Sequence, residues 1–273
     1  MNPKNLLDLH IHTDNSFDGN HSAIFLCETA VSRGLRAVAL TDHLEMDHFF
    51  DQNFDRTAMQ SYFEIVKARS AFRGTLVVLA GVELGDPTYD IPQSEALLRQ
   101  YDYDFVIGSI HNLRNTADFW FLRYDEITDD EIRTLLEQYF EEVLALARWG
   151  KFDALAHLTY PLRYICGEHG RKVDLHVYAQ QIDAILETAA KNQLALEINT
   201  SGLRQKIGVT MPNLDIVRRF RALGGKRVTI GSDAHFAKDL GAGIAEGMEI
   251  ALRAGFSHVS LYQNREPIEI LIA

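Results

Sequence analysis

The segment Leu6-Leu7-Asp8-Leu9-His10-Ile11-His12 is the stretch from which the fold and the site are inferred. It is an apolar run that ends in two histidines, two positions apart. Side chains of a β-strand alternate between its faces, so residues i and i+2 point the same way. Both imidazoles would therefore project from one strand end into a common space, as ligands of a metal site do. A strand that merely ends in polar residues explains this pair equally well, so the other strand ends must decide.

Length and composition place the chain among globular proteins. It has 273 residues, of which 47% are hydrophobic and 24% are charged, and we expect a single domain spanning residues 1–273. The formal net charge of −11 would repel a phosphate backbone, which argues against a nucleic-acid partner. A small anionic substrate stays possible, because bound cations can reverse the field inside a cleft.

The two cysteines, Cys27 and Cys166, are far apart and form no disulfide framework, which suits a reducing compartment. The N-terminus lacks a basic region followed by a long apolar run, and no uncharged stretch is long enough to span a bilayer. We therefore expect a cytoplasmic protein without a membrane partner.

Apolar strand-like runs alternate with helical patterns along the chain. We expect strands near residues 5–10, 36–40, 75–83, 105–108, 152–156, 194–198, 227–230 and 259–262, and helices near residues 22–34, 57–72, 93–100, 129–149, 175–192, 214–223 and 241–254. This alternation predicts a parallel α/β sheet covered by helices. No GxGxxG turn follows the first strand, which argues against a Rossmann unit. A closed (β/α) barrel with about seven or eight strands is the better match.

Residues that can ligate a metal recur where the predicted strands end. Those at or just past a strand end are His10, His12, His43, Glu83, His111, His157, Asp233 and His235, and Asp18 lies on the loop after the first strand. In a parallel barrel these ends converge on one face. A random scatter of the 11 histidines would not place six of them there. The pattern as a whole therefore predicts a metal site.

Nine ligands are too many for one ion. Imidazole combined with carboxylate suits zinc, iron or manganese better than calcium or magnesium. We therefore expect two to three divalent transition-metal ions that share bridging carboxylates.

At this point the chain resembles a known family. The successive segments that carry the resemblance are Leu9-His10-Ile11-His12-Thr13, Thr41-Asp42-His43, Gly81-Val82-Glu83, Gly108-Ser109-Ile110-His111, Ala156-His157 and Gly231-Ser232-Asp233-Ala234-His235. They are similar to the ordered motifs of the polymerase-and-histidinol-phosphatase (PHP) superfamily and span residues 8–235. The resemblance implies a distorted (β/α)7 TIM-like barrel with a trinuclear metal site.

Chain length and the segment from Glu197 to Arg204 resemble the stand-alone L-histidinol-phosphate phosphatases of that superfamily. This implies hydrolysis of L-histidinol phosphate in histidine biosynthesis. The resemblance also implies a distribution of ligands: one ion on His10, His12, Glu83 and Asp233, a second on Asp18, His43 and His235, and a third on Glu83, His111 and His157. Where many members have an acid two residues after the strand-five histidine, this chain has Thr159.

Charge balance favours a phosphate monoester as substrate. Three dications would be balanced by the carboxylates of Asp18, Glu83 and Asp233, a bridging hydroxide and a phosphate dianion. The hypothesis is that a metal-bridging hydroxide attacks phosphorus while the ions spread the developing charge. Glu83 would bridge ions, and Asp233 or His235 would manage the proton given to the leaving alkoxide.

Two arginines are candidates for binding the substrate. Arg163 and Arg204 follow the fifth and sixth strands, on the metal side, and a guanidinium can bind phosphate through two parallel hydrogen bonds. A solvated surface arginine explains Arg163 equally well and Arg204 less well. Phe119, Trp120 and Glu168 lie in loops that could reach the amine of an amino alcohol.

Three other functions remain open. Metal-dependent amidohydrolases also begin with HxH but commonly use a lysine at the end of strand four, where this chain has Ser109-Ile110-His111. A PHP phosphoesterase acting on phosphotyrosine or a nucleotide has the same ligands, because ligands do not select the leaving group. A non-catalytic barrel with structural ions is disfavoured, because structural sites are usually closed. The sequence leaves the oligomeric state open.

Overall fold

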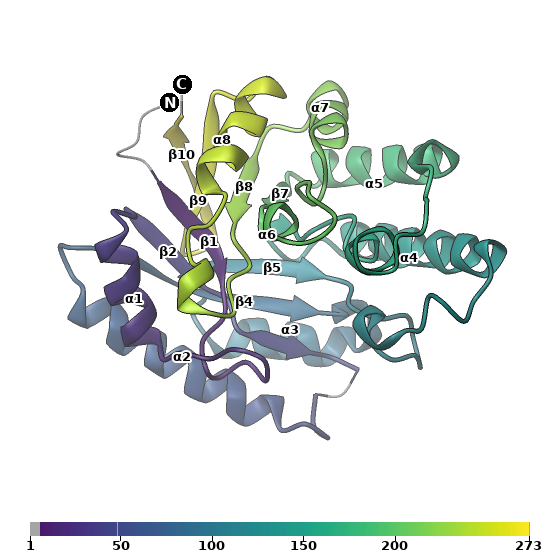
Figure 1. Cartoon of the computed structure of the whole chain (residues 1–273). Helices are drawn as coiled ribbons and strands as arrows, with labels where there is room; N and C mark the ends of the chain where they lie inside the picture. Colours follow the sequence, from purple (N-terminus) through teal and green to yellow (C-terminus); the bar gives the residue numbers. More distant parts are fainter. Residues whose placement is uncertain (1–5, 48, 273) are drawn as a thin grey trace.

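The computed structural model describes residues 6–47 and 49–272. Over those residues, parallel strands follow one another around a barrel in the order β1-β2-β4-β5-β6-β7-β8 (Figure 1). Their bounds are β1 Leu7–Ile11, β2 Ala37–Leu40, β4 Val77–Gly85, β5 Phe105–Ser109, β6 Ala154–Leu155, β7 Ala195–Asn199 and β8 Val228–Gly231. The predicted α/β class and the seven-stranded, TIM-like barrel are confirmed.

The barrel nearly closes between its first and last strands. The backbone N–H of Asp233 donates to the carbonyl of His10 at 2.8 Å, and that of His12 donates to the carbonyl of Ala234 at 2.9 Å. Ile11 and Ala234 form an isolated parallel bridge. Residues of the first strand and of the segment after the last barrel strand therefore lie side by side at the carboxyl ends of the strands.

A short strand, β3 (His43–Glu45), continues the path of β2 along β4. Leu40 pairs with Ala80, and His43 pairs with Glu83, so both strands share one register on β4. The sequence predicted that this strand would close on His43. Its continuation places Glu45 beside Gly85.

Helices cover the outside of the barrel (Figure 1). The predicted helices are present as α1 Ala23–Ser32, α2 Phe54–Ala71, α3 Ile91–Gln100, α4 Asp129–Trp149, α5 Ala179–Lys191, α7 Leu214–Ala222 and α8 Ile244–Arg253. One further helix, the single turn α6 (Ser201–Arg204), was not predicted. Thr128 and Glu131 form a capping box that fixes the start of α4. In the described part of the chain, no helix is both long and apolar enough to cross a membrane.

The chain ends in an antiparallel hairpin of β9 (His258–Gln263) and β10 (Glu266–Leu271), of which only the first strand was predicted. Its turn residues, Asn264 and Arg265, have φ values of 51° and 66°. Two-residue turns of this kind usually have the sequence Asn-Gly. Because arginine replaces the glycine here, the sequence did not indicate a hairpin. The turn contacts Asp104 and Asp153, which precede β5 and β6, and therefore lies at the amino end of the barrel.

We expect Arg265→Ala to destabilise the barrel. Arg265 Nε lies 2.5 Å from Asp153 Oδ2, and burial raises the pKa of Asp153 to about 6 although Arg265 opposes this. Loss of the guanidinium should lower the free energy of unfolding by ~1–3 kcal/mol at pH 8. The deficit should shrink at pH 5, because a raised folded-state pKa lets the carboxyl protonate there.

Urea unfolding at the two pH values measures this effect. Arg123→Ala is the control, because Arg123 pairs only with exposed acids. An equal loss of stability at pH 8 in both variants would contradict the role assigned to Arg265.

Candidate metal centre

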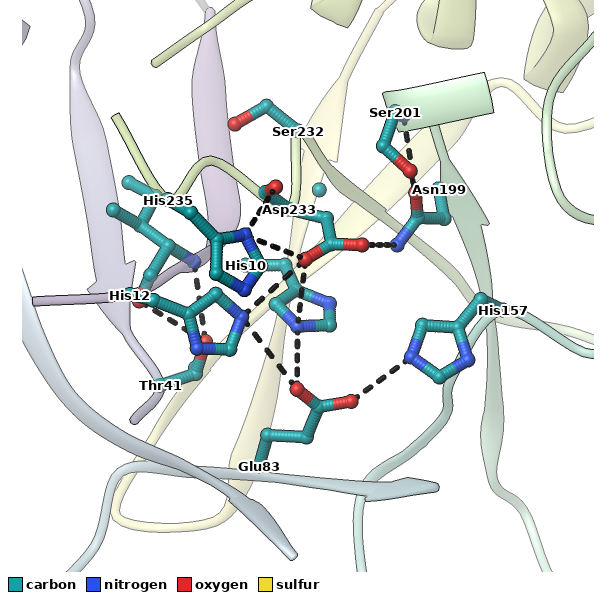
Figure 2. Close-up of polar contacts among 12 residues, drawn as sticks. His10, His12, Thr41, Glu83, His157, Asn199, Ser201, Ser232, Asp233 and His235 are labelled. Atoms are coloured by element: carbon teal, nitrogen blue, oxygen red, sulfur yellow. Dashed lines mark hydrogen bonds and ion pairs between the residues drawn. The ribbon is translucent and has the colours of Figure 1, made fainter. Parts of the chain in front are cut away.

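Glu83, near the end of β4, contacts histidines that the sequence singled out, and Figure 2 shows its contacts with His10, His12 and His157. Its Oε2 is 3.0 Å from His10 Nε2, 3.2 Å from His43 Nδ1 and 3.5 Å from His12 Nε2. Its Oε1 is 2.9 Å from His157 Nε2 and 3.1 Å from His111 Nε2. One buried carboxylate thus contacts five imidazoles that come from four different stretches of the chain.

Asp233, just past β8, extends the cluster on the side of β1. Its Oδ1 lies 3.4 Å from His12 Nε2, 3.5 Å from His235 Nδ1 and 3.8 Å from His10 Nε2. The residue has a φ of 53°, in the left-handed region that costs a non-glycine residue free energy. The backbone bond from Asp233 to His10 holds it there, and backbone strain of this kind is concentrated at functional sites.

Asp18 and His235 form the outer part of the cluster. Asp18 Oδ2 lies 3.0 Å from His235 Nε2, and Asp18 Oδ1 lies 3.8 Å from His43 Nε2. The imidazoles of His12 and His235 stack with ring centroids 4.1 Å apart. All nine residues expected as ligands are therefore brought together, and their roles as ligands stay predictions.

The donor set fits divalent cations better than a hydrogen-bonded network. Among the described residues, His12 Nε2 and Asp18 Oδ1 are buried without a hydrogen-bond partner. The Nε2 atoms of His111 and His157 lie 3.5 Å apart, and both face Glu83 Oε1. Three triplets have ligand atoms within 4.8 Å of one another: His12, His43 and His235; His10, His12 and Glu83; and His43, Glu83 and His111. Overlapping triplets of this kind can hold more than one ion.

Charge states in the cluster suit metal binding. Burial, with added repulsion from His235 and His43, lowers the pKa of His12 to about 3, so its imidazole is neutral at pH 7. Burial alone would raise the pKa of Glu83, but His10, His43 and His111 hold this pKa well below its usual range. His12 and Glu83 are thus in the forms that ligate metals. Nearby carboxylates, against the effect of burial, raise the pKa of His10 and His111 well above its usual range, so these two imidazoles release a proton when an ion binds.

Two acidic residues of the site were not among the predicted ones. Glu197, on β7, lies with Oε1 2.6 Å from His10 Nδ1 and accepts the backbone N–H of His157 on Oε2 at 2.8 Å. Glu45, on β3, lies with Oε1 3.0 Å from His111 Nδ1. The sequence offered a signal for each residue. Glu197 is an acid inside an apolar strand, and Glu45 is an acid two residues after His43.

The cluster forms the floor of a cavity of about 830 Å³. Arg163 lines this cavity and donates from Nη2 to Asp233 Oδ2 at 2.7 Å and to Ser201 Oγ at 2.6 Å. Arg204 is not part of the lining. Its guanidinium binds the carbonyls of Ser232 and Asp233 at 2.6 and 2.8 Å, so the structure places it as a clamp on the loop after β8.

Of the residues considered for an amine, Trp120 and Glu168 line the cavity, and Phe119 is buried outside the lining. Glu168 Oε2 is already 2.6 Å from Lys206 Nζ. Asp118, which the sequence did not single out, also lines the cavity.

We expect Glu83→Gln to lose bound metal. The amide preserves volume but removes the charge that faces five imidazoles, so the zinc or manganese content should fall. Turnover should drop by ~100-fold or more, because mutation of residues that only support ligands already lowers metal affinity or activity ~10–100-fold. Elemental analysis of purified protein checks this, with Glu64→Gln on α2 as the control. Wild-type metal content in Glu83→Gln would contradict the central position of Glu83.

Comparison with known proteins places this site in a family context. The model of the PHP domain matches residues 8–201, a range that leaves Asp233 and His235 outside. A probable histidinol-phosphatase of Thermotoga maritima is 31% identical over 260 residues, which cover 94% of this chain and 95% of the relative. The histidinol-phosphatase of Lactococcus lactis is 24% identical, with 94% of each chain covered.

A crystal structure of the histidinol phosphate phosphatase of Lactococcus lactis, complexed with zinc, L-histidinol and phosphate, has a similar fold. The TM-score is 0.80 at 22% sequence identity, over 96% of this chain and 98% of that chain. The histidinol phosphatase structure from Listeria monocytogenes, described as putative, has a TM-score of 0.72 at 19% identity, over 88% of this chain and 99% of that chain. These likenesses show that the barrel architecture is shared.

Proposed function

The chain belongs to the PHP domain family, and from that premise we propose that it is a metal-dependent phosphomonoesterase that converts L-histidinol phosphate to L-histidinol and phosphate. Relatives that match it over nearly their whole length have this activity in their names. The complex of the Lactococcus lactis protein with zinc, L-histidinol and phosphate supports the same substrate and zinc as a cofactor.

The observation that carries the proposal is that groups suited to a phosphate and groups suited to an amine line one cavity. The imidazole cluster, once it holds cations, and Arg163 suit a phosphate. The carboxylates of Asp47 and Asp118 suit an ammonium group. L-Histidinol phosphate carries a phosphate at one end and an amine and an imidazole at the other, so its charges match both sets of groups.

We assign the ions to the residues expected from the sequence. His10, His12, Asp18, His43, Glu83, His111, His157, Asp233 and His235 would hold two to three divalent ions of zinc, iron or manganese. When bound, such ions lower the pKa of a water molecule and offset the charge of the phosphoryl group.

Arg163 is the protein group best placed to bind the phosphoryl oxygens. Its Nη2 is oriented by Asp233 and Ser201, and its buried Nε–H has no acceptor among the described residues. A phosphate above the floor would supply that acceptor, and buried donors are rarely left unpaired. Arg204 supports this arrangement indirectly, because it fixes the backbone of Asp233.

Asp233 and His235 are the two groups named from the sequence for the proton given to the leaving alcohol. Both oxygens of Asp233 are engaged, by His12 and His235 on one side and by Arg163 on the other. His235 lies on the cavity surface, 21% exposed, with Nε2 facing Asp18 and Nδ1 facing the carbonyl of Asp233. Both nitrogens of His235 are therefore engaged as well, so both residues stay candidates for this step, and Asp233 also orients Arg163.

Asp118 is the candidate partner for the substrate amine. Its Oδ1 accepts the backbone N–H of Trp120 at 2.6 Å and the hydroxyl of Tyr160 at 3.3 Å. Within the described chain, no hydrogen bond reaches its Oδ2. The carboxylate is thus held in position by contacts of one oxygen, at a place where the residue lines the cavity.

We extend the proposal to the whole chain as one catalytic domain. The hairpin β9–β10 contacts the amino end of the barrel and is therefore part of the same domain. We also propose that the protein is cytoplasmic, because the free thiols of Cys27 and Cys166 suit a reducing compartment.

A phosphate-release screen on protein of known metal content tests the function. L-Histidinol phosphate should give the highest kcat/KM in a panel that includes phosphotyrosine, nucleotides and sugar phosphates. A preference of more than about tenfold for another ester, or ~1.4 kcal/mol in transition-state binding, would overturn the choice of substrate. Hydrolysis of amides or lactones in place of phosphoesters would instead indicate an amidohydrolase.

We expect Asp118→Asn to raise KM for L-histidinol phosphate about tenfold, because the amide keeps the shape but loses the charge facing the ammonium group. The same variant should hydrolyse phenyl phosphate, which has no amine, at the wild-type kcat/KM. Asp125→Asn, on the exposed surface nearby, is the control. An equal loss of kcat/KM for both substrates would show that Asp118 does not recognise the amine.

A further inference from the structure

We propose that Glu45 is a positioning residue that couples two of the ion positions by binding His43 and His111 at once. The inference rests on the metal site of the proposed function, and it assigns a role to a residue outside the nine ligands.

The backbone places Glu45 where it can do this. His43 and Glu45 lie two residues apart on β3, so their side chains leave the same face of the sheet. The register of β3 on β4 sets His43 beside Glu83 and Glu45 beside Gly85. On the other side of β4, Gly85 pairs with Ser109, two residues before His111. Glu45 therefore needs to cross only one strand to reach His111.

Gly85 leaves that path open. A Cβ built on Gly85 would lie 1.7 Å from Glu45 Oε2 and 2.4 Å from its carboxyl carbon. The carboxylate thus occupies the space that a side chain at position 85 would fill. Any larger residue there would push Glu45 away from His111, which gives this glycine a role linked to the site.

The carboxylate then lies between two of the histidines. Glu45 Oε1 is 3.0 Å from His111 Nδ1 in a hydrogen bond. The same oxygen is 3.1 Å from His43 Nδ1, an ion-pair contact without hydrogen-bond geometry, and that nitrogen also lies 3.2 Å from Glu83 Oε2. The opposite nitrogen of His111, Nε2, is 3.1 Å from Glu83, and the opposite nitrogen of His43, Nε2, faces Asp18 at 3.8 Å. With Nδ1 of His111 donating to Glu45, its Nε2 carries the lone pair needed for a metal.

Glu197 supports His10 in the same way from the other side of the site, at 2.6 Å from Nδ1. Carboxylates that hold the second nitrogen of a ligating histidine fix its tautomer and orientation and increase its basicity.

The difference between the two acids is what they connect. Glu197 supports His10 through its side chain and His157 only through its backbone. Glu45 contacts the side chain of His43, assigned with Asp18 and His235, and that of His111, assigned with Glu83 and His157. Removal of Glu45 should therefore weaken both of these ion positions and leave the one on His10, His12 and Asp233 in place.

Metal titration of the purified, metal-free protein tests the proposal. Zinc binding is followed by calorimetry, and Co2+ is used as a second probe because its visible absorption reports the ligand set. Glu45→Gln should bind fewer ions with wild-type affinity, and the remaining ions ~10–100-fold more weakly, the range typical for such supporting residues. Gly85→Ala, which keeps the acid but displaces it, should show the same loss.

The controls separate this role from folding and from the overall function. Glu95→Gln removes an exposed ion pair with Arg99 on α3, and this variant should bind zinc as the wild type does. Urea unfolding of the metal-free variants measures the fold alone. Unchanged ion number and affinity in Glu45→Gln would overturn the proposal, as would a loss confined to the stability of the metal-free protein. Wild-type protein that binds ions but hydrolyses no phosphomonoester would count against the proposed function and leave the role of Glu45 standing.

Discussion

The contact between the carboxylate of Glu83 and five imidazoles is the interaction on which this site depends. A carboxylate that is removed from water without compensation costs several kcal/mol. Asp233 and Glu197 are buried beside it, so positive charge must be present among the histidines. Protons supply that charge in the metal-free chain, and divalent ions supply more of it. Metal binding therefore contributes to the free energy of folding.

Sequence reasoning predicted the barrel and the ligand cluster because both follow from a repeated local rule. Six of the seven barrel strands, all but β7, end at or near a residue that can ligate a metal, and parallel strands bring those ends to one face. The structure confirms that His10 and His157, which are far apart in the chain, lie close to one carboxylate. A rule that applies to each strand separately needs no knowledge of which strands are neighbours.

Features that depend on neighbouring strands could not be predicted in this way. The role of Glu45 requires the register of β3 on β4 and the missing side chain at Gly85. Arg204 stays a predicted substrate contact, and its hydrogen bonds to the carbonyls of Ser232 and Asp233 could not be predicted, because they depend on the path of a loop. The turn at Asn264 and Arg265 was missed because its left-handed residues include no glycine.

The seam between β1 and β8 gives the closure of the barrel a chemical consequence. His10 and His12 come from the first strand, and Asp233 follows the last, and backbone hydrogen bonds join them across the seam. During synthesis, the first of these residues leaves the ribosome long before the last. An ion that requires both sides cannot be held until the segment that follows β8 has emerged. Metal loading is thereby tied to the synthesis of β8 and the loop after it, and a truncated product that lacks β8 cannot assemble this reactive centre.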